Sequence, residues 1–178
     1  MKNILDYPIG KDFPEKVNVI VEVPMGSRNK YEMDKDSGMI VLDRVLYTAM
    51  EYPVNYGFIP QTWWEDEDPL DAMVISAFPV HPGVVIEGKV LGLLRMEDEK
   101  GIDDKILLVN TKDPRVSNIN SLEEVPQTLL DEIAHFFERY KELEKGKWVK
   151  VKGWLSKEEA IKIVQKAHEM YKEKFRVK

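Results

Sequence analysis

Alternation of apolar and polar positions dominates the first 115 or so residues and predicts strands. The valines at positions 17, 19, 21 and 23 recur with the period of two that is typical of a strand with one strongly apolar face. Glu22 is predicted to lie on the opposite face. Residues 29–34 alternate as well, which places Lys30 and Glu32 on one face. The chain therefore opens with two predicted strands that each carry acidic or basic side chains.

Further strands follow at wider intervals. The sequence Asp-Ser-Gly at 36–38 predicts a turn, and residues 39–42 begin the next strand. Residues 83–94 predict a long strand that Gly88 or Gly92 bends. Residues 106–109 form a short apolar run, and residues 147–154 alternate again.

Two helices are predicted near the C-terminus. Apolar residues recur at helical spacing over 129–140, with Pro126 suited to the opening turn. Ser156 to Glu159 form a capping box that starts a second helix. Five or more strands followed by two helices favour an α+β fold, mainly β, in which helices pack on a small curved sheet or barrel. No repeat or linker divides residues 1–178, so a single domain is expected.

Composition narrows the classes of function. The hydrophobic fraction is 43%, which is typical of a globular protein. The absence of cysteine excludes disulfides and thiolate zinc sites, and together with a start unlike a signal peptide it favours a cytoplasmic location. No apolar run reaches the roughly 18 residues of a membrane span, so no membrane partner is expected. The net charge of −6 argues against nucleic acid as a partner.

The most informative segment is 66–71, where three aspartates surround a proline. If the segment is extended, Asp66 and Asp68 point the same way and Glu67 points opposite. Pro69 restricts the backbone, after which a turn would bring Asp71 back towards the other two. Three converging carboxylates repel one another unless hard cations lie between them, so the segment predicts a magnesium site. An acidic turn without any ligand is the alternative.

A second acidic cluster lies at 97–105 and is, by itself, typical of a solvated hairpin loop. It gains interest only if the fold brings it against residues 66–71. Cations and phenols precede and follow the two clusters, and each taken alone suggests packing or surface exposure; they are Lys30, Arg44, Tyr52, Tyr56, Tyr140 and Lys141, with Lys105 at the end of the second cluster. Together with metal-binding carboxylates they are suited to bind a polyanionic phosphate. Motifs of P-loop nucleotidases, HExxH zinc hydrolases and G-x-S-x-G serine hydrolases are missing.

These motifs resemble those of the soluble, family I inorganic pyrophosphatases. The segment 66–71 matches the family pattern D-x-D-P-x-D, and ordered matches run from about residue 19 to residue 154. They include V-E-V-P at 21–24, K-Y-E at 30–32, Y-P-V-N-Y-G at 52–57 and A-H-F-F-E-R-Y-K at 134–141. The resemblance implies hydrolysis of pyrophosphate with several Mg²⁺ ions, on a five-stranded OB-like β-barrel with two flanking C-terminal helices. It also implies a homohexamer, as in prokaryotic members.

The resemblance carries roles to individual positions. It implies that Asp66, Asp71, Asp98 and Asp103 bind metal, and that Asp68 is the general base. The implied phosphate-binding residues are Lys30, Arg44, Tyr56, Lys105, Tyr140 and Lys141, and the implied supporting residues are Glu22, Glu32 and Tyr52. Asp104 beside Asp103 leaves the choice of ligand there open. Oxygen ligands favour Mg²⁺ but leave Mn²⁺ and Zn²⁺ as substitutes.

Two alternative functions stay open at this point. A metal-dependent hydrolase of nucleoside di- or triphosphates would use the same charged residues, but it needs a pocket that stacks on a base, which the sequence does not specify. An OB-type nucleic-acid-binding module would suit the predicted barrel. The acidic balance and the clustered aspartates argue against that module.

Overall fold

The structure is a computed structural model that describes residues 4–175. Its strands are β1 (Lys16–Val23), β2 (Asn29–Met33), β3 (Ile40–Val45), β4 (Asn55–Phe58), β5 (Asp71–Ile75), β6 (Val85–Asp98), β7 (Gly101–Asn110) and β8 (Val149–Leu155). Its helices are α1 (Gln127–Arg139) and α2 (Lys157–Phe175), with single 3-10 turns η1 (Ile4–Asp6) and η2 (Leu122–Glu124). The strands β1 to β7 therefore all precede α1, as the periodicity predicts.

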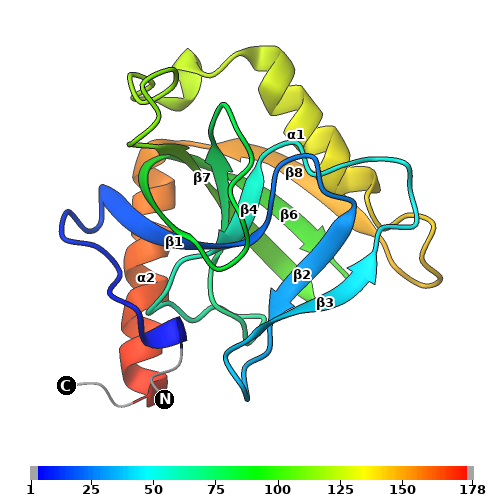
Figure 1. Ribbon diagram of the computed structural model, residues 1–178, viewed down its shortest axis with the longest axis horizontal. Helices are drawn as coiled ribbons and strands as arrows, with labels where there is room; N and C mark the ends of the chain where they lie inside the picture. The colour runs from blue at the N-terminus through cyan, green and yellow to red at the C-terminus, as the bar shows by residue number, and fades with distance from the viewer. Residues whose placement is uncertain (1–3, 176–178) are drawn as a thin grey trace.

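Five strands close on themselves. The pairing order is β1-β4-β5-β7-β6, and a further pairing of β1 with β6 completes the ring (Figure 1). Only the β5–β7 pair is parallel. Strand β8 extends the sheet from β6, and β2 and β3 form a separate two-stranded sheet. The mainly β fold with a five-stranded ring and two helices is confirmed.

The length of β6 allows one strand to serve both the ring and its extension. Residues 85–89 pair with β1, whereas residues 93–98 pair with β8. Between these two parts the register against β7 shifts from Val90 to Gly92, a bulge that redirects the strand. The predicted bend is thus found at Gly92 rather than at Gly88.

The strands β4 and β5 were not predicted. The sequence suggested an aromatic turn over 52–57, but residues 55–57 belong to β4, whose four residues are all buried. The buried Asn55 side chain accepts hydrogen bonds from the backbone N–H groups of Met25 (3.1 Å) and Val80 (2.9 Å), which allows a polar residue inside the sheet. Gly57 is required by close approach, because a Cβ atom there would lie 1.9 Å from the carbonyl oxygen of Ile20.

The two helices cover different parts of the sheet. Helices α1 and α2 lie at different sides of the sheet (Figure 1). The apolar residues of α1 share one core cluster with residues of several strands, whereas α2 packs along β6 and buries Ala160, Val164 and Ala167. Helix α2 starts as predicted, with the hydroxyl of Ser156 accepting a hydrogen bond from the N–H of Glu159 at 3.4 Å. Within residues 4–175, neither helix is long and apolar enough to cross a membrane.

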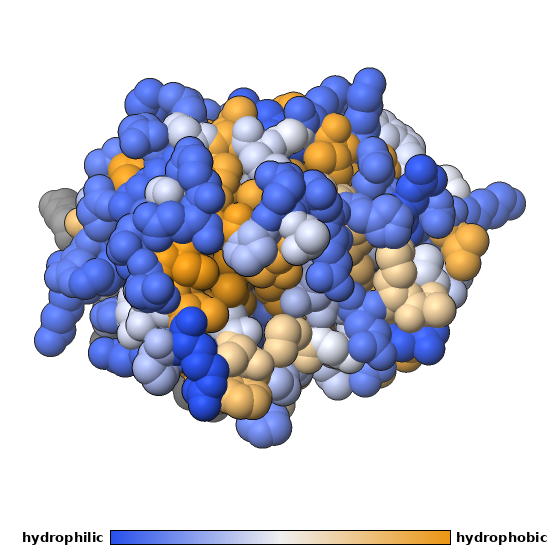
Figure 2. Space-filling model, turned by 90° about the horizontal axis from the view of Figure 1, so that it is seen from above, coloured by the Kyte–Doolittle hydropathy of each residue, from blue (hydrophilic) through white to orange (hydrophobic). Residues whose placement is uncertain are grey.

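Charged and polar side chains dominate the visible surface, with apolar groups in separate patches (Figure 2). The largest exposed apolar side chains on and beside β3 are Met39, Leu42 and Tyr47. Leu42 lies on β3, and Met39 and Tyr47 flank that strand, so all three belong to the part of the fold outside the five-stranded ring.

Candidate active site

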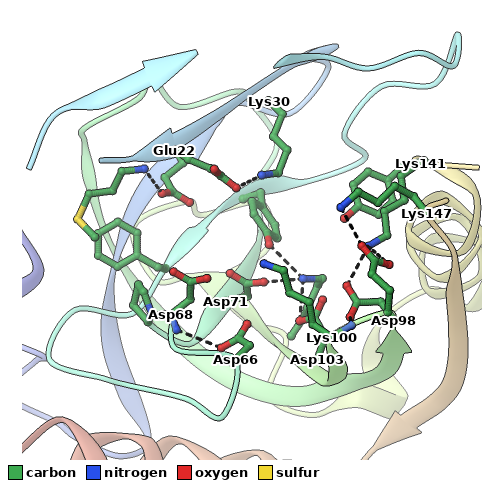
Figure 3. Close-up of a pocket in the computed structure, with 18 of the residues that line it drawn as sticks. Glu22, Lys30, Asp66, Asp68, Asp71, Asp98, Lys100, Asp103, Lys141 and Lys147 are labelled. Carbon is green, nitrogen blue, oxygen red and sulfur yellow. Dashed lines mark hydrogen bonds and ion pairs between the residues drawn. The ribbon is translucent and has the colours of Figure 1, made fainter. Parts of the chain in front are cut away.

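One cavity of about 330 Å³ collects nearly all of the predicted site residues. It lies where the β2–β3 sheet, the loop before β5, the β6–β7 hairpin and the loop after α1 meet (Figure 3). Thirteen predicted residues line it, namely Glu22, Lys30, Glu32, Arg44, Tyr56, Asp66, Asp68, Asp71, Asp98, Asp103, Lys105, Tyr140 and Lys141. The two acidic clusters, which lie some thirty residues apart in sequence, therefore share one site.

The acidic segment before β5 is a tight turn, so the expectation of an extended segment is wrong. Glu67 has a left-handed backbone with φ of 64°. The turn is closed because the N–H of Trp64 donates to the carbonyl of Asp68 at 2.8 Å, and the N–H of Asp68 donates to the carboxylate of Asp66 at 3.2 Å. Short acidic side chains compete with extended pairing through such local bonds. Asp66 and Asp68 nevertheless both line the cavity.

Repulsion between carboxylates is visible at Asp66. Burial, followed by the charges of Asp71 and Asp68, raises the pKa of Asp66 to about 6. A carboxylate in this position is stabilised in its charged form by any nearby cation. The cluster is thus electrostatically unfavourable by itself.

Lys105 lies at the centre of the site. Its ammonium group donates to Asp71 (2.5 Å), to Asp103 (3.1 Å) and to the hydroxyl of Tyr56 (3.1 Å). Burial opposes the charge, but Asp103 and Asp71 outweigh it and hold the pKa of Lys105 well above its ordinary value. Lys105 therefore stays positively charged although it is fully buried.

The alternation of β7 places Asp103 and Asp104 on opposite faces of the strand. Asp103 and Lys105 face the cavity together, as predicted, whereas Asp104 points away. Arg95 donates to both oxygens of Asp104, at 2.9 and 2.8 Å. Asp104 is thus occupied by a bidentate ion pair outside the cavity.

Glu22 lies deep in the cavity wall, opposite Asp71. It accepts a hydrogen bond from the N–H of Met33 at 2.7 Å. Burial raises the pKa of Glu22 to about 8, against that hydrogen bond. The group is therefore protonated at neutral pH unless a cation compensates its charge.

Arg44 and Lys30 are held by acidic side chains on the β2–β3 side. Asp43 accepts from Lys30 at 3.3 Å and from Arg44 at 2.5 Å, and Lys30 also pairs with Glu32. On its other side, Nε of Arg44 lies 3.0 Å from Oε1 of Glu144. Sequence reasoning missed Glu144, because an acidic residue after a helix is usually solvated.

The loop after α1 closes the cavity opposite the acidic turn. Lys141 donates to Asp98 at 2.8 Å and lies 3.3 Å from Glu99, which also pairs with Lys147 at 3.0 Å. Burial would raise the pKa of Glu99, but its own backbone N–H and the two lysines lower that pKa to about 2. Glu99 and Lys147 were not predicted; neither were Lys35, which pairs with Asp68, nor Lys100 at the hairpin turn.

The tyrosines occupy two layers. Tyr56 and Tyr140 line the cavity, and burial raises the pKa of each hydroxyl above its ordinary value, so both remain hydrogen-bond donors. Tyr52 lies behind them, with its ring 5.4 Å from that of Tyr56 and 4.7 Å from that of Phe136. It is the one predicted residue that does not line the cavity.

The donor set fits magnesium in chemistry. All the candidate ligands are carboxylates, which suit a hard divalent cation, and the raised pKa of Asp66 shows that positive charge is needed beside it. Within residues 4–175, no three acidic or histidine side chains are drawn together as a closed metal cluster. Lysine ammonium groups stand beside the carboxylates instead, with Lys105 between Asp71 and Asp103.

Comparison with known proteins decides the family. A family model described as inorganic pyrophosphatase matches residues 19–172. The chain belongs to the inorganic pyrophosphatase family. Its hydrolase class and its soluble, family I type, expected from the motifs, are confirmed.

Relatives of this pyrophosphatase match over almost their whole length. The inorganic pyrophosphatase of Thermus thermophilus is 51% identical over 174 residues, which cover 97% of this chain and 99% of the relative. That of Aquifex pyrophilus is 50% identical over 169 residues, covering 94% and 96%. A crystal structure of the Thermus thermophilus pyrophosphatase superposes with a TM-score of 0.93, covering 96% of this chain and 99% of that one.

Proposed function

We propose that this enzyme hydrolyses inorganic pyrophosphate to two phosphates, with magnesium ions as cofactors and Asp68 as general base. The observation that carries the proposal is the interleaving of charges in one small cavity, where buried carboxylates and buried cations alternate. The carboxylates suit divalent cations and the cations suit a polyanion, so the same cavity accommodates a metal–phosphate complex. Pyrophosphate is also the substrate in the names of the relatives.

Four aspartates would hold the magnesium ions, namely Asp66, Asp71, Asp98 and Asp103. Glu22 and Glu32 would support the ions through bound water, and Mn²⁺ or Zn²⁺ would substitute to some extent. Bound ions of this kind lower the pKa of a coordinated water and neutralise charge on the leaving phosphate.

The basic and phenolic side chains would orient the substrate. Arg44 presents a planar fork to phosphate oxygens, whereas Lys30, Lys105 and Lys141 act as point charges. Tyr56 and Tyr140 keep their protons and donate hydrogen bonds without adding charge. Tyr52 packs behind Tyr56 and would support the acidic cluster.

The surroundings of Asp68 support its proposed role in accepting the proton of the attacking water. It lies on the rim of the cavity, pairs with Lys35, and shares the acidic turn with Asp66. Both side chains of this pair are partly exposed, so water can reach the carboxylate. Asp68 would accept the proton as the water oxygen attacks one phosphorus and the bond from that phosphorus to the bridging oxygen breaks, which releases the second phosphate.

Two variants test these roles. We expect Asp68→Asn to lower kcat by about 10²-fold or more while Mg²⁺ affinity is retained, because general-base catalysis contributes typically this much. Asp71→Asn should weaken Mg²⁺ binding as well, measured by calorimetric titration. Phosphate release from pyrophosphate is compared with release from ATP, with and without EDTA. Near-normal turnover by Asp68→Asn at saturating Mg²⁺, or equal rates on ATP, would contradict the proposal.

We also propose that the enzyme is cytoplasmic, as the absence of cysteine favours, and that it is a homohexamer, as the family resemblance implies. The exposed apolar side chains of Met39, Leu42 and Tyr47 support an assembly, because a subunit interface would remove them from water.

A further inference from the structure

Glu144 contacts Arg44, which among the described residues is the only arginine that lines the cavity. Its Oε1 lies 3.0 Å from Nε of Arg44, and its side chain is only 11% exposed. On the opposite side of the guanidinium, NH1 donates to Asp43 at 2.5 Å. Two carboxylates therefore hold Arg44 from two sides, and Glu144 does so without lining the cavity itself.

The buried state of Glu144 calls for an explanation. Two buried atoms of this pair make no hydrogen bond among the described residues: Oε2 of Glu144 and Nε of Arg44. The two side chains are therefore close enough for ionic attraction, but they are not aligned as a hydrogen bond. A buried carboxylate oxygen without a donor costs free energy. A solvated position would avoid this cost on a loop whose neighbour Glu142 is exposed.

The position of Glu144 connects two walls of the cavity. It belongs to the loop between α1 and β8, which also supplies Tyr140, Lys141 and Lys147 (Figure 1). Its own backbone holds that loop in a turn, because its N–H donates to the carbonyl of Lys141 at 3.0 Å and its carbonyl accepts from Lys147 at 3.1 Å. The contact with Arg44 therefore ties this loop to β3 across the site.

We propose that Glu144 is a positioning residue that holds the Arg44 guanidinium in the orientation that binds pyrophosphate. Asp43 alone leaves the guanidinium free to rotate about its contact, and Asp43 is shared with Lys30. A second carboxylate beside Nε adds an ionic attraction on another side of the group, which restrains how far the guanidinium can turn away from the cavity that Arg44 lines. The inference rests on the proposed role of Arg44 in binding phosphate.

The test compares Glu144→Gln with Glu144→Asp, using Glu142→Gln as the matched control. Glu142 lies on the same loop, is 46% exposed and pairs with Arg139 outside the cavity. We expect Glu144→Gln to raise KM for magnesium pyrophosphate about tenfold with kcat nearly unchanged, since the guanidinium that would bind substrate loses one of the two carboxylates that restrain it. Glu144→Asp keeps the charge and should recover part of the affinity, and Glu142→Gln should leave both constants unchanged.

The same substitutions in an Arg44→Lys background separate positioning from a role in loop stability. If Glu144 acts through the guanidinium, Glu144→Gln should have little further effect on KM once Arg44 is lysine. An equal effect in both backgrounds, an unchanged KM in Glu144→Gln alone, or equal KM values for the Asp and Gln variants would overturn the inference and leave the role of Arg44 intact. An unchanged KM in Arg44→Lys alone would instead contradict the proposed phosphate-binding role, and this inference with it.

Discussion

Replacing Lys105 by methionine tests whether the cavity is built around a cation that metal can replace. Methionine has a similar length and keeps the apolar stem, but it removes the charge and all three donors. Asp71 and Asp103 then lose the ammonium group that lies 2.5 and 3.1 Å from them, and Tyr56 loses its partner. Two partly buried carboxylates are left without the cation between them.

The expected loss of stability is large in the metal-free enzyme. Removing one member of a buried ion pair costs about 3–5 kcal/mol, because the remaining charge is left without compensation. For a chain of this length, each kcal/mol lowers Tm by roughly 2–4 °C, which gives a loss of about 10 °C. With Mg²⁺ present the loss should be much smaller, since binding to the native state alone stabilises it by mass action and a cation between Asp71 and Asp103 restores the missing charge.

The assay is thermal denaturation of both proteins at one concentration, in EDTA and in excess MgCl₂. Arg95→Met is the matched control, because it breaks the bidentate pair with buried Asp104 on the outer face of the same hairpin. Its effect on Tm should be the same with and without Mg²⁺. If Mg²⁺ raised the Tm of Lys105→Met no more than it raised the Tm of Arg95→Met, the idea that metal and ammonium share the same carboxylates would be wrong.

Two further predictions concern pH and assembly. The pKa of Glu22 is raised from its ordinary value of 4.5 to about 8 in the folded protein. Between these two pH values the folded state keeps a proton that the unfolded state releases. The metal-free enzyme should therefore lose stability as pH rises from about 5 to 8, by at most roughly 1.4 kcal/mol per pH unit. In urea titrations, Glu22→Gln should flatten this dependence of the unfolding free energy on pH. An unchanged slope would show that other groups cause it. Sedimentation velocity should show a species of six chains, and a monomer at micromolar concentration would refute the proposed hexamer.

Much of the fold follows from local patterns, and the parts that do not are explained by burial. Strands β1 and β6 and both helices were predicted because each keeps one apolar face over several turns or alternations. Strands β4 and β5 were missed because closure of the ring buries them almost completely, which removes the alternation that marks a half-exposed strand. No local signal in Asn-Tyr-Gly-Phe reveals that Asn55 will find three backbone partners.

The candidate site shows the same division between local and tertiary information. The cluster of three aspartates beside Pro69 could be predicted because its residues are close in sequence. The turn that holds Asp66 and Asp68 was not predicted. The ion pairs of Glu144 with Arg44 and of Lys35 with Asp68 join segments 100 and 33 residues apart. A charged residue in a loop usually faces solvent, and only the fold distinguishes such residues from those that orient a binding group.

The distribution of charge around the cavity links metal binding to substrate binding. Eight acidic and seven basic side chains line it, so neither a divalent cation nor a pyrophosphate anion meets a surface of one sign. In the metal-free protein the lysines neutralise the carboxylates, with Lys105 beside Asp71 and Asp103 and Lys141 beside Asp98. Once divalent cations neutralise these carboxylates, both lysines have positive charge available for phosphate oxygens. If these side chains have the proposed roles, we expect pyrophosphate affinity to rise with bound metal and, since such coupling is reciprocal, metal affinity to rise with bound pyrophosphate by the same factor.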